Sequence, residues 1–258
     1  MFETAMMNPP EGKKNPATPA IRAVLFDLDD TLWPIVPVIV RAETVLFDWL
    51  RLHAPAVPAR FSIAALRERR GALMTTNPRY LYDLTALRHA ALYEAFTVCG
   101  EDCAKIEQAM AVFAQARNQV TPFEDVTTCL PRLARRVRLG SLTNGGADLQ
   151  AIGLAHHFDV SLAAHQMGCA KPDPAIFHAA CQALGLTPAQ VAYVGDDLAL
   201  DVEGAQHAGL HGIWINRTGS PPKTTHAHIR PDASCQSLHE LENWLLAHND
   251  GVTDSKSG

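Results

Sequence analysis

Three short apolar segments constrain the fold of this chain most, because each of them ends in polar residues. They are IRAVLFD (21–27), VRLGSLTN (137–144) and VAYVGDD (191–197). Weaker segments of the same kind occupy 158–164 and 211–216. Short apolar runs bounded by turn residues are typical of buried parallel strands. Helical patterns separate them, at about 126–136, 147–154, 174–185, 202–208 and 237–248. This alternation predicts an α/β fold with a Rossmann-like, doubly wound parallel sheet.

A long interval without strand patterns separates the first predicted strand from the second. It contains one helical stripe from Val38 to Leu50, another from Ile106 to Val120, and helical patterns at 62–74 and 84–99. We therefore predict an α-helical cap domain over 37–120, inserted into a catalytic core made of 21–36 and 121–248. Open α/β sheets bind ligands at the carboxyl ends of their strands, so the cap should lie over that edge.

The terminal segments bear on the localisation of the protein, and its net charge bears on the partners that it can bind. Residues 1–20 hold prolines and charges without the apolar stretch of a signal peptide, which predicts a disordered leader, and 249–258 predict a flexible tail. No segment is apolar enough for long enough to span a bilayer. The net charge of −5 weighs against a nucleic-acid partner. We expect a cytoplasmic protein with no nucleic-acid or membrane partner; the sequence does not define its oligomeric state.

Polar residues follow each of the three strong strand candidates. The first ends in Asp27 and Asp29, the second in Thr143-Asn144-Gly145, and the third in Asp196-Asp197, with Asp201 four residues on. Lys171 stands between the second and the third. Because parallel strands end at one edge of a sheet, these acids, the hydroxyl and the ammonium group should converge there. Carboxylates in such a group attract a divalent cation, and the lysine offsets a further negative charge.

The order of these motifs resembles that of a known family. DLDDT, SLTNG, KPDP and GDDLALD follow one another between about Ala23 and Arg217, as in haloacid dehalogenase (HAD) superfamily hydrolases with a helical cap. The resemblance favours the phosphatase branch. It implies a phosphoric monoester hydrolase that uses Mg²⁺ and acts on a small phosphorylated metabolite.

The resemblance also implies a role for each motif residue. Asp27 matches the nucleophile, which forms an aspartyl-phosphate, and Asp29 matches the general acid and base. Thr143 and the backbone N–H of Asn144 would hold phosphoryl oxygens, and Lys171 would neutralise charge.

The remaining acids are assigned to a metal site and its surroundings. The family pattern implies that Asp196 binds Mg²⁺ together with the Asp27 carboxylate and the Asp29 backbone carbonyl. Asp201 would orient waters and Lys171 from a second layer. Asp197 either belongs to that layer or caps a helix, and Asp30 is expected to cap a turn.

Substrate contacts are predicted in two places. Trp33 follows the first motif and would either line the pocket or pack beneath the insert. In the cap, Arg79 and Arg88 are candidates to contact the leaving group, together with Tyr80 and Tyr82.

Three alternatives to a phosphatase stay open. A hydrolytic 2-haloacid dehalogenase typically lacks the second acid of the first motif, whereas Asp29 is present here. A phosphomutase would use the same acids but must shield the intermediate from water. A non-enzymatic binding module would keep the fold without needing this complete set of acids and lysine.

Overall fold

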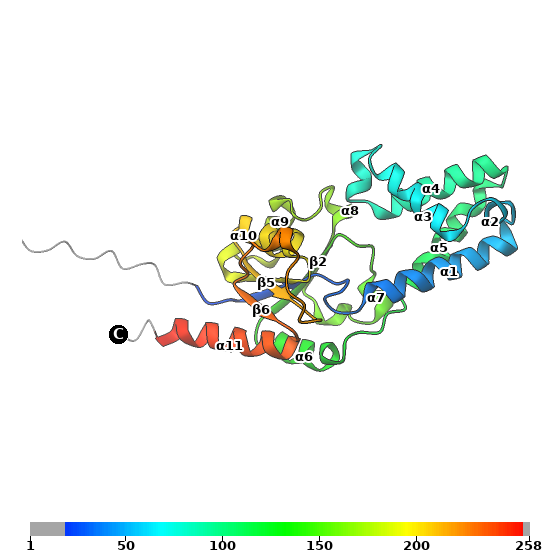
Figure 1. Ribbon diagram of the computed structural model, residues 1–258. Helices are drawn as coiled ribbons and strands as arrows, with labels where there is room; N and C mark the ends of the chain where they lie inside the picture. The colour runs from blue at the N-terminus through cyan, green and yellow to red at the C-terminus, as the bar shows by residue number, and fades with distance from the viewer. Residues whose placement is uncertain (1–18, 255–258) are drawn as a thin grey trace, which may run out of the picture.

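The computed structural model describes residues 19–254, and its centre is a six-stranded parallel sheet with the order β3-β2-β1-β4-β5-β6 (Figure 1). The strands are β1 (Ala23–Phe26), β2 (Arg138–Thr143), β3 (Val160–Ala163), β4 (Val191–Gly195), β5 (His211–Ile215) and β6 (Ala233–Cys235). The chain builds outward from β1 in one direction and then returns to build outward from β4 in the other. This reversal creates a crevice at the carboxyl ends of β1 and β4. The predicted Rossmann-like sheet is confirmed.

Helices cover both faces of the sheet because the side chains of each strand alternate between them. Val24 and Phe26 of β1 point to one face, and Ala23 and Leu25 point to the other. The first face is covered by α6 (Glu124–Ala134) and α11 (Leu238–Asp254). The second is covered by α9 (Pro174–Leu184) and α10 (Gly204–His207). Two short helices complete the core, α7 (Leu149–Ile152) and α8 (Ala164–Met167).

Five helices between β1 and β2 form a separate lobe (Figure 1). They are α1 (Ile35–His53), α2 (Ala56–Arg60), α3 (Ile63–Met74), α4 (Leu84–Cys99) and α5 (Ile106–Arg117). Their buried side chains make a hydrophobic cluster of their own, which includes Leu46, Leu50, Phe96 and Phe113. A lobe with its own core can pack beside the sheet without interrupting it, and we refer to this lobe as the cap.

The structure differs from the sequence-based expectation at the carboxyl-terminal end of the core. Strand β6 was not predicted, because its segment is only three residues long and mixes polar with apolar side chains. Helix α11 continues to Asp254, past the predicted end at 248 and into the predicted flexible tail. The Asn249 side chain explains part of this extension, since it bonds both the N–H (2.9 Å) and the carbonyl (3.0 Å) of Ile21.

Two further expectations concern the ends of the chain and membranes. The predicted leader lies outside the described residues except for its last two positions. Among the described helices, none combines the length and the apolar character that crossing a membrane requires.

Candidate active site

The candidate site lies where β1, β2 and β4 end. Asp27 directly follows β1, Thr143 is the last residue of β2, and Asp196 directly follows β4. The strands are in register, because Phe26 lies opposite both Ser141 of β2 and Val194 of β4. Residues one or two places further on therefore emerge at the same level of the sheet edge.

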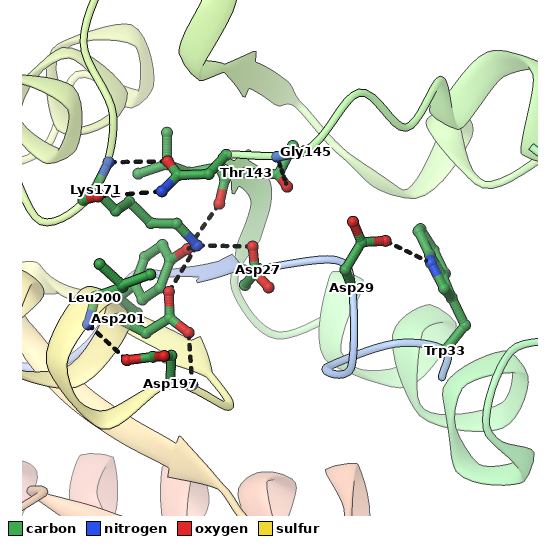
Figure 2. A network of polar contacts seen from close by, with 12 residues as sticks. Asp27, Asp29, Trp33, Thr143, Gly145, Lys171, Asp197, Leu200 and Asp201 are labelled. Carbon is green, nitrogen blue, oxygen red and sulfur yellow. Dashed lines mark hydrogen bonds and ion pairs between the residues drawn. The ribbon is translucent and has the colours of Figure 1, made fainter. Parts of the chain in front are cut away.

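Lys171 is the centre of the site (Figure 2). Its ammonium group donates to Asp27 Oδ1 at 2.7 Å, to Asp201 Oδ1 at 2.6 Å and to the Tyr193 hydroxyl at 2.8 Å. The tyrosine hydroxyl in turn donates to the carbonyl of Leu142 at 2.7 Å. All three protons of the ammonium group therefore have acceptors, which fixes the position of the lysine beside Asp27.

The pKa of Lys171 reflects these partners. Burial alone would lower the pKa of the lysine, but the Asp201 and Asp27 carboxylates outweigh burial and hold it well above its usual range. Lys171 is therefore a permanent positive charge in a buried site, as the sequence-based role requires.

The acids of the site exceed the positive charge that faces them. Carboxylate oxygens of Asp27, Asp196 and Asp201, which we call the acidic cluster, lie within 4.8 Å of one another, while Lys171 is the ammonium group among them. Burial raises the pKa of Asp27 to about 7, helped by Asp201 and opposed by Lys171. Burial also raises the pKa of Asp196 to about 8, with Asp27 and Asp201 adding to the effect. The site thus holds more negative charge than its own residues can neutralise.

This imbalance fits a divalent cation. The donors are carboxylate oxygens, which hard cations such as Mg²⁺ prefer, and three carboxylates against one ammonium leave an excess of two negative charges. Asp201 already accepts from Lys171 and, at Oδ2, from the N–H of Asp197 at 2.9 Å. Asp27 and Asp196 therefore have the freer oxygens of the acidic cluster.

The loop that presents Lys171 is attached to the end of β2 by Asn144. The Asn144 side chain accepts from the Lys171 N–H at 2.9 Å and donates to the Lys171 carbonyl at 3.1 Å. The Thr143 hydroxyl accepts from the N–H of Gly145 at 2.9 Å. The asparagine side chain is thus structural, and its backbone N–H is the group left for the predicted phosphoryl contact.

Asp29 faces away from this lysine and toward the cap (Figure 2). Its Oδ1 accepts from the Trp33 indole at 2.9 Å, and both of its oxygens lie 2.6 Å from Nη2 of Arg117, the last residue of α5. Gly145 leaves room for this carboxylate, because a Cβ there would lie 2.6 Å from Asp29 Oδ2. The arrangement holds Asp29 between the core and the cap.

Asp30 and Asp197 accept hydrogen bonds from backbone N–H groups. Asp30 adopts a left-handed conformation (φ 58°) and accepts from the N–H of Ile35 at 2.9 Å, so it closes the turn after β1 as predicted. Asp197 accepts from the N–H groups of Ala199 and Leu200, both at 2.9 Å, and so caps the helical turn Leu198–Glu203. Of the two roles that the sequence left open for Asp197, the structure supports the cap.

A cavity of about 510 Å³ lies between the cap and this edge of the core. It is lined by Asp29, Arg117 and Gly145 from the site and by Arg88 and apolar side chains of the cap, which include Ile39, Met110 and Phe113. Apart from Asp29 and the loop at Gly145, the cavity is formed by the cap, so the predicted role of Asp29 would put a leaving group there.

Two predicted substrate contacts do not line this cavity. Of the two roles that the sequence left open for Trp33, the structure supports packing, because its side chain is fully buried in the core cluster beneath the insert. Arg79 is largely exposed and pairs at 2.8 Å with Asp83, four residues further on, where the short segment Pro78–Leu81 leads into α4. Arg88 does line the cavity.

A second group of potential metal ligands lies on the covered face of the sheet, away from this edge. It consists of Cys129 of α6 with His239 and Glu242 of α11. The Arg132 guanidinium lies 3.2 Å from the sulfur of Cys129, 3.0 Å from His239 Nδ1 and 2.8 Å from a Glu242 oxygen. Because a guanidinium fills the space that a metal ion would need, this group is a polar contact between two helices.

Two residues of the site were not found by sequence reasoning. Arg117 ends a cap helix 88 positions from Asp29, and its segment looks like an ordinary amphipathic helix. Tyr193 lies inside β4, where an aromatic residue is typical of any buried strand. The available signal for Arg117 was its place on the apolar stripe, four residues after Phe113, since an arginine on the buried face of a helix needs a partner.

Comparison with known proteins agrees with this geometry. Residues 21–209 match the model of the haloacid dehalogenase-like hydrolase family. The chain is 30% identical to the 5-amino-6-(5-phospho-D-ribitylamino)uracil phosphatase YigB of Escherichia coli, over 87% of this chain and 96% of that protein. It is also 30% identical to a phosphoserine phosphatase of Thermus thermophilus, over 86% of this chain and 98% of that protein.

Among solved structures, a 2-haloacid dehalogenase from Pseudomonas syringae pv. Tomato aligns with a TM-score of 0.81 and 37% identity, covering 88% of this chain and 98% of the other. The match to the family model spans strands β1 to β4, the cap and all four motifs. The chain therefore belongs to the haloacid dehalogenase-like hydrolase family.

Proposed function

We propose that this protein is a Mg²⁺-dependent phosphomonoester hydrolase that acts on a small phosphorylated metabolite through an aspartyl-phosphate intermediate. The observation that carries the proposal is the position of Asp29, a second acid held at the mouth of the cavity by Trp33 and Arg117. An alkoxide leaving group needs a proton, and in this proposal Asp29 supplies it. Two curated relatives named as phosphatases support the same class of reaction.

In the first step, an Asp27 oxygen attacks phosphorus and the bond between phosphorus and the ester oxygen breaks. Lys171, 2.7 Å from Asp27 Oδ1, holds the carboxylate in place and offsets charge that develops on the phosphoryl group. The Thr143 hydroxyl and the backbone N–H of Asn144 would receive phosphoryl oxygens. Asp29 gives its proton to the departing oxygen, so the product leaves as a neutral alcohol.

In the second step, the ionised Asp29 takes a proton from a water molecule, whose oxygen attacks the phosphorus. The acyl-phosphate bond breaks, inorganic phosphate leaves, and Asp27 returns as a carboxylate. Asp29 regains its proton in this step, so both carboxyl groups are ready for another turnover.

Asp27 and Asp196, with the backbone carbonyl of Asp29, are the groups that would hold Mg²⁺. The bound ion would lower the pKa of both carboxyl groups and counter the charge of the phosphoryl group. Asp201 would act on Lys171, which it contacts at 2.6 Å, and so position the lysine.

A hydrolytic dehalogenase is the second candidate, because the structure from Pseudomonas syringae carries that name. Halide leaves without a proton, so a dehalogenase has no use for Asp29 as an acid. The presence of Asp29 at the mouth of the cavity therefore supports the phosphatase. Localisation in the cytoplasm stays a prediction.

The test is a panel of small phosphomonoesters assayed for phosphate release with Mg²⁺, together with 2-chloropropionate assayed for halide. We expect phosphate release from members of the panel and no halide release. A second arm compares Asp29→Ala with the wild type on alkyl and aryl phosphates. Loss should be larger for alkyl substrates, because an aryl oxide with a low pKa needs less protonation. Halide release without any phosphatase activity would overturn the proposal.

A further inference from the structure

Arg88 of α4 stands out among the residues that line the cavity because it has no anionic partner. Its Nη1 atom is buried and has no hydrogen-bond partner, and the guanidinium carbon lies 3.4 Å from the centre of the Phe113 ring. Within the described part of the chain, Arg88 has no hydrogen bond or ion pair, and Glu43, Arg67 and Arg70 act on it only through their charges. A buried guanidinium normally has a carboxylate or several carbonyl groups around it.

The nearest acids are already occupied. Glu43 of α1 is buried and accepts from both Arg67 and Arg70. Glu107, which lines the same cavity, lies 3.1 Å from His89 and is largely exposed. The cap therefore brings three arginines near one buried carboxylate and leaves the charge of Arg88 uncompensated. Burial, with a smaller effect of Arg70, lowers the pKa of Arg88 to about 9, so the side chain still carries its charge at neutral pH.

We propose that Arg88 binds a carboxylate on the leaving group, so that the substrates are phosphomonoesters of small hydroxy acids. This inference rests on the proposed function and names its substrate class. A guanidinium offers two parallel N–H groups that match a carboxylate. A single uncompensated cation also matches a single negative charge, whereas a second phosphate would leave an excess of negative charge in a largely apolar cavity.

The position of Arg88 agrees with such a substrate. Arg88 lies over Phe113, which precedes Arg117 by four residues on α5 and therefore by roughly 6 Å along the helix axis. Arg117 contacts Asp29, the group that meets the ester oxygen. The cavity thus has a reacting end at Asp29 and an anion-binding end about one helical turn away.

The test uses terminally phosphorylated alkanoic acids of three to six carbons, each paired with the amide that replaces its carboxylate. We expect the wild type to prefer the acid in kcat/KM by at least about tenfold for the chain that fits best, because hydrogen bonds to charged groups are worth more than neutral ones. Arg88→Gln should abolish this preference, and Arg88→Lys should keep part of it. Arg60→Gln, on the exposed surface of the cap, is the matched control and should keep all of it.

Equal use of acid and amide by the wild type, or a preference that survives in Arg88→Gln, would overturn the inference. Binding of the corresponding phosphonates, measured by calorimetry, gives the same acid-to-amide ratio without turnover. If no phosphate ester is hydrolysed, the proposed function is wrong, and the phosphonate ratio still decides whether Arg88 selects a carboxylate. Melting temperatures of the three variants establish that each is folded.

Discussion

Two groups of charged residues with opposite excess charge lie on either side of the active-site edge. In the core, the acidic cluster of Asp27, Asp196 and Asp201 faces the ammonium group of Lys171. In the cap, the buried Glu43 faces Arg67 and Arg70 and lies near Arg88, and we call these four residues the cap cluster. The core has too few cations for its acids, and the cap has too few acids for its cations.

Charge imbalance of this kind is costly in a folded protein unless something else completes it. The excess of acids that remains in the core after Lys171 is counted fits a divalent cation. The excess of arginines in the cap fits an anion that arrives with the substrate. The acidic cluster and the cap cluster would therefore bind the two ends of one ligand. Each cluster can be disrupted by mutation without changing the other.

The largest effect is expected from Asp27→Asn in the core. The amide keeps the size of the side chain but cannot form the acyl-phosphate bond, so hydrolysis of an aryl phosphate should fall by at least about a thousandfold. Phosphate release measures the loss, and the circular dichroism spectrum serves as the control for folding. Near-normal turnover by a folded Asp27→Asn protein would exclude Asp27 as the nucleophile.

Removal of the metal is the next test of the acidic cluster. EDTA should lower turnover by at least several hundredfold, and Mg²⁺ should restore it, because the excess negative charge would otherwise repel the phosphoryl group. Calcium should restore less, since its larger and looser coordination shell disturbs the alignment of the reacting atoms. Full activity in metal-free protein would contradict the metal assignment and favour the dehalogenase.

The cap cluster predicts an effect on stability of moderate size. Glu43→Gln removes the buried partner of two arginines and should cost about 2 kcal/mol, less than for a fully buried pair because Arg67 is largely exposed and can turn to solvent. The melting temperature should fall by about 4 to 8 °C. Glu94→Gln, whose bond to Arg69 is long at 3.3 Å and more exposed, should change it little. Equal effects of the two variants would show that the cap cluster contributes nothing special to stability.

The effect of Glu43→Gln on stability should also depend on pH. The Arg67 and Arg70 side chains outweigh burial and hold the pKa of Glu43 below its usual range. A carboxyl group with a lowered pKa stabilises the fold above its unfolded pKa and loses that contribution as the pH falls through its folded pKa. The difference in stability between wild type and Glu43→Gln should therefore shrink in acid.

The two regions also differ in how well the sequence predicted them. Asp27, Thr143 and Asp196 could be located because a polar residue that directly follows a buried parallel strand must emerge at the sheet edge. Lys171 and Asp201 were expected at the same edge, and only their roles come from the resemblance. The structure brings the Lys171 ammonium group into contact with both Asp27 and Asp201. No such rule applies to the cap, where the direction of a helix face depends on how several helices pack.

Arg79, Arg88 and Arg117 illustrate this limit. Arg88 and Arg117 lie on predicted helical segments and Arg79 lies between two of them, and nothing in the sequence around these arginines shows which of them faces the cavity. Packing turns Arg79 toward Asp83 near the surface, Arg117 toward Asp29, and Arg88 into the cavity without a partner. Trp33 shows the same limit, because its position after the first motif left open whether it lines the pocket or packs beneath the insert. The structure packs it in the core, where its indole donates to Asp29.

The smallest expected effect sharpens the comparison most, because its sign is the reverse of the effect of Glu43→Gln. Arg88→Met keeps an unbranched side chain over Phe113 and removes the uncompensated charge. The folded protein binds the Arg88 proton less tightly than the unfolded chain does, since burial lowers its pKa to about 9. The charge therefore costs folding free energy at every pH below this value, and the cost declines as the pH rises further.

Arg88→Met should raise stability by about 1 kcal/mol at pH 7, which corresponds to an increase of about 2 to 4 °C in melting temperature, and the increase should be smaller at pH 10. Arg70→Met, which removes a paired arginine, is the matched control and should lower the melting temperature. A residue that weakens the fold without serving it structurally is typical of a binding site. If Arg88→Met destabilised the protein as Arg70→Met does, Arg88 would be a structural arginine, and the cap would hold no vacant positive charge for a substrate.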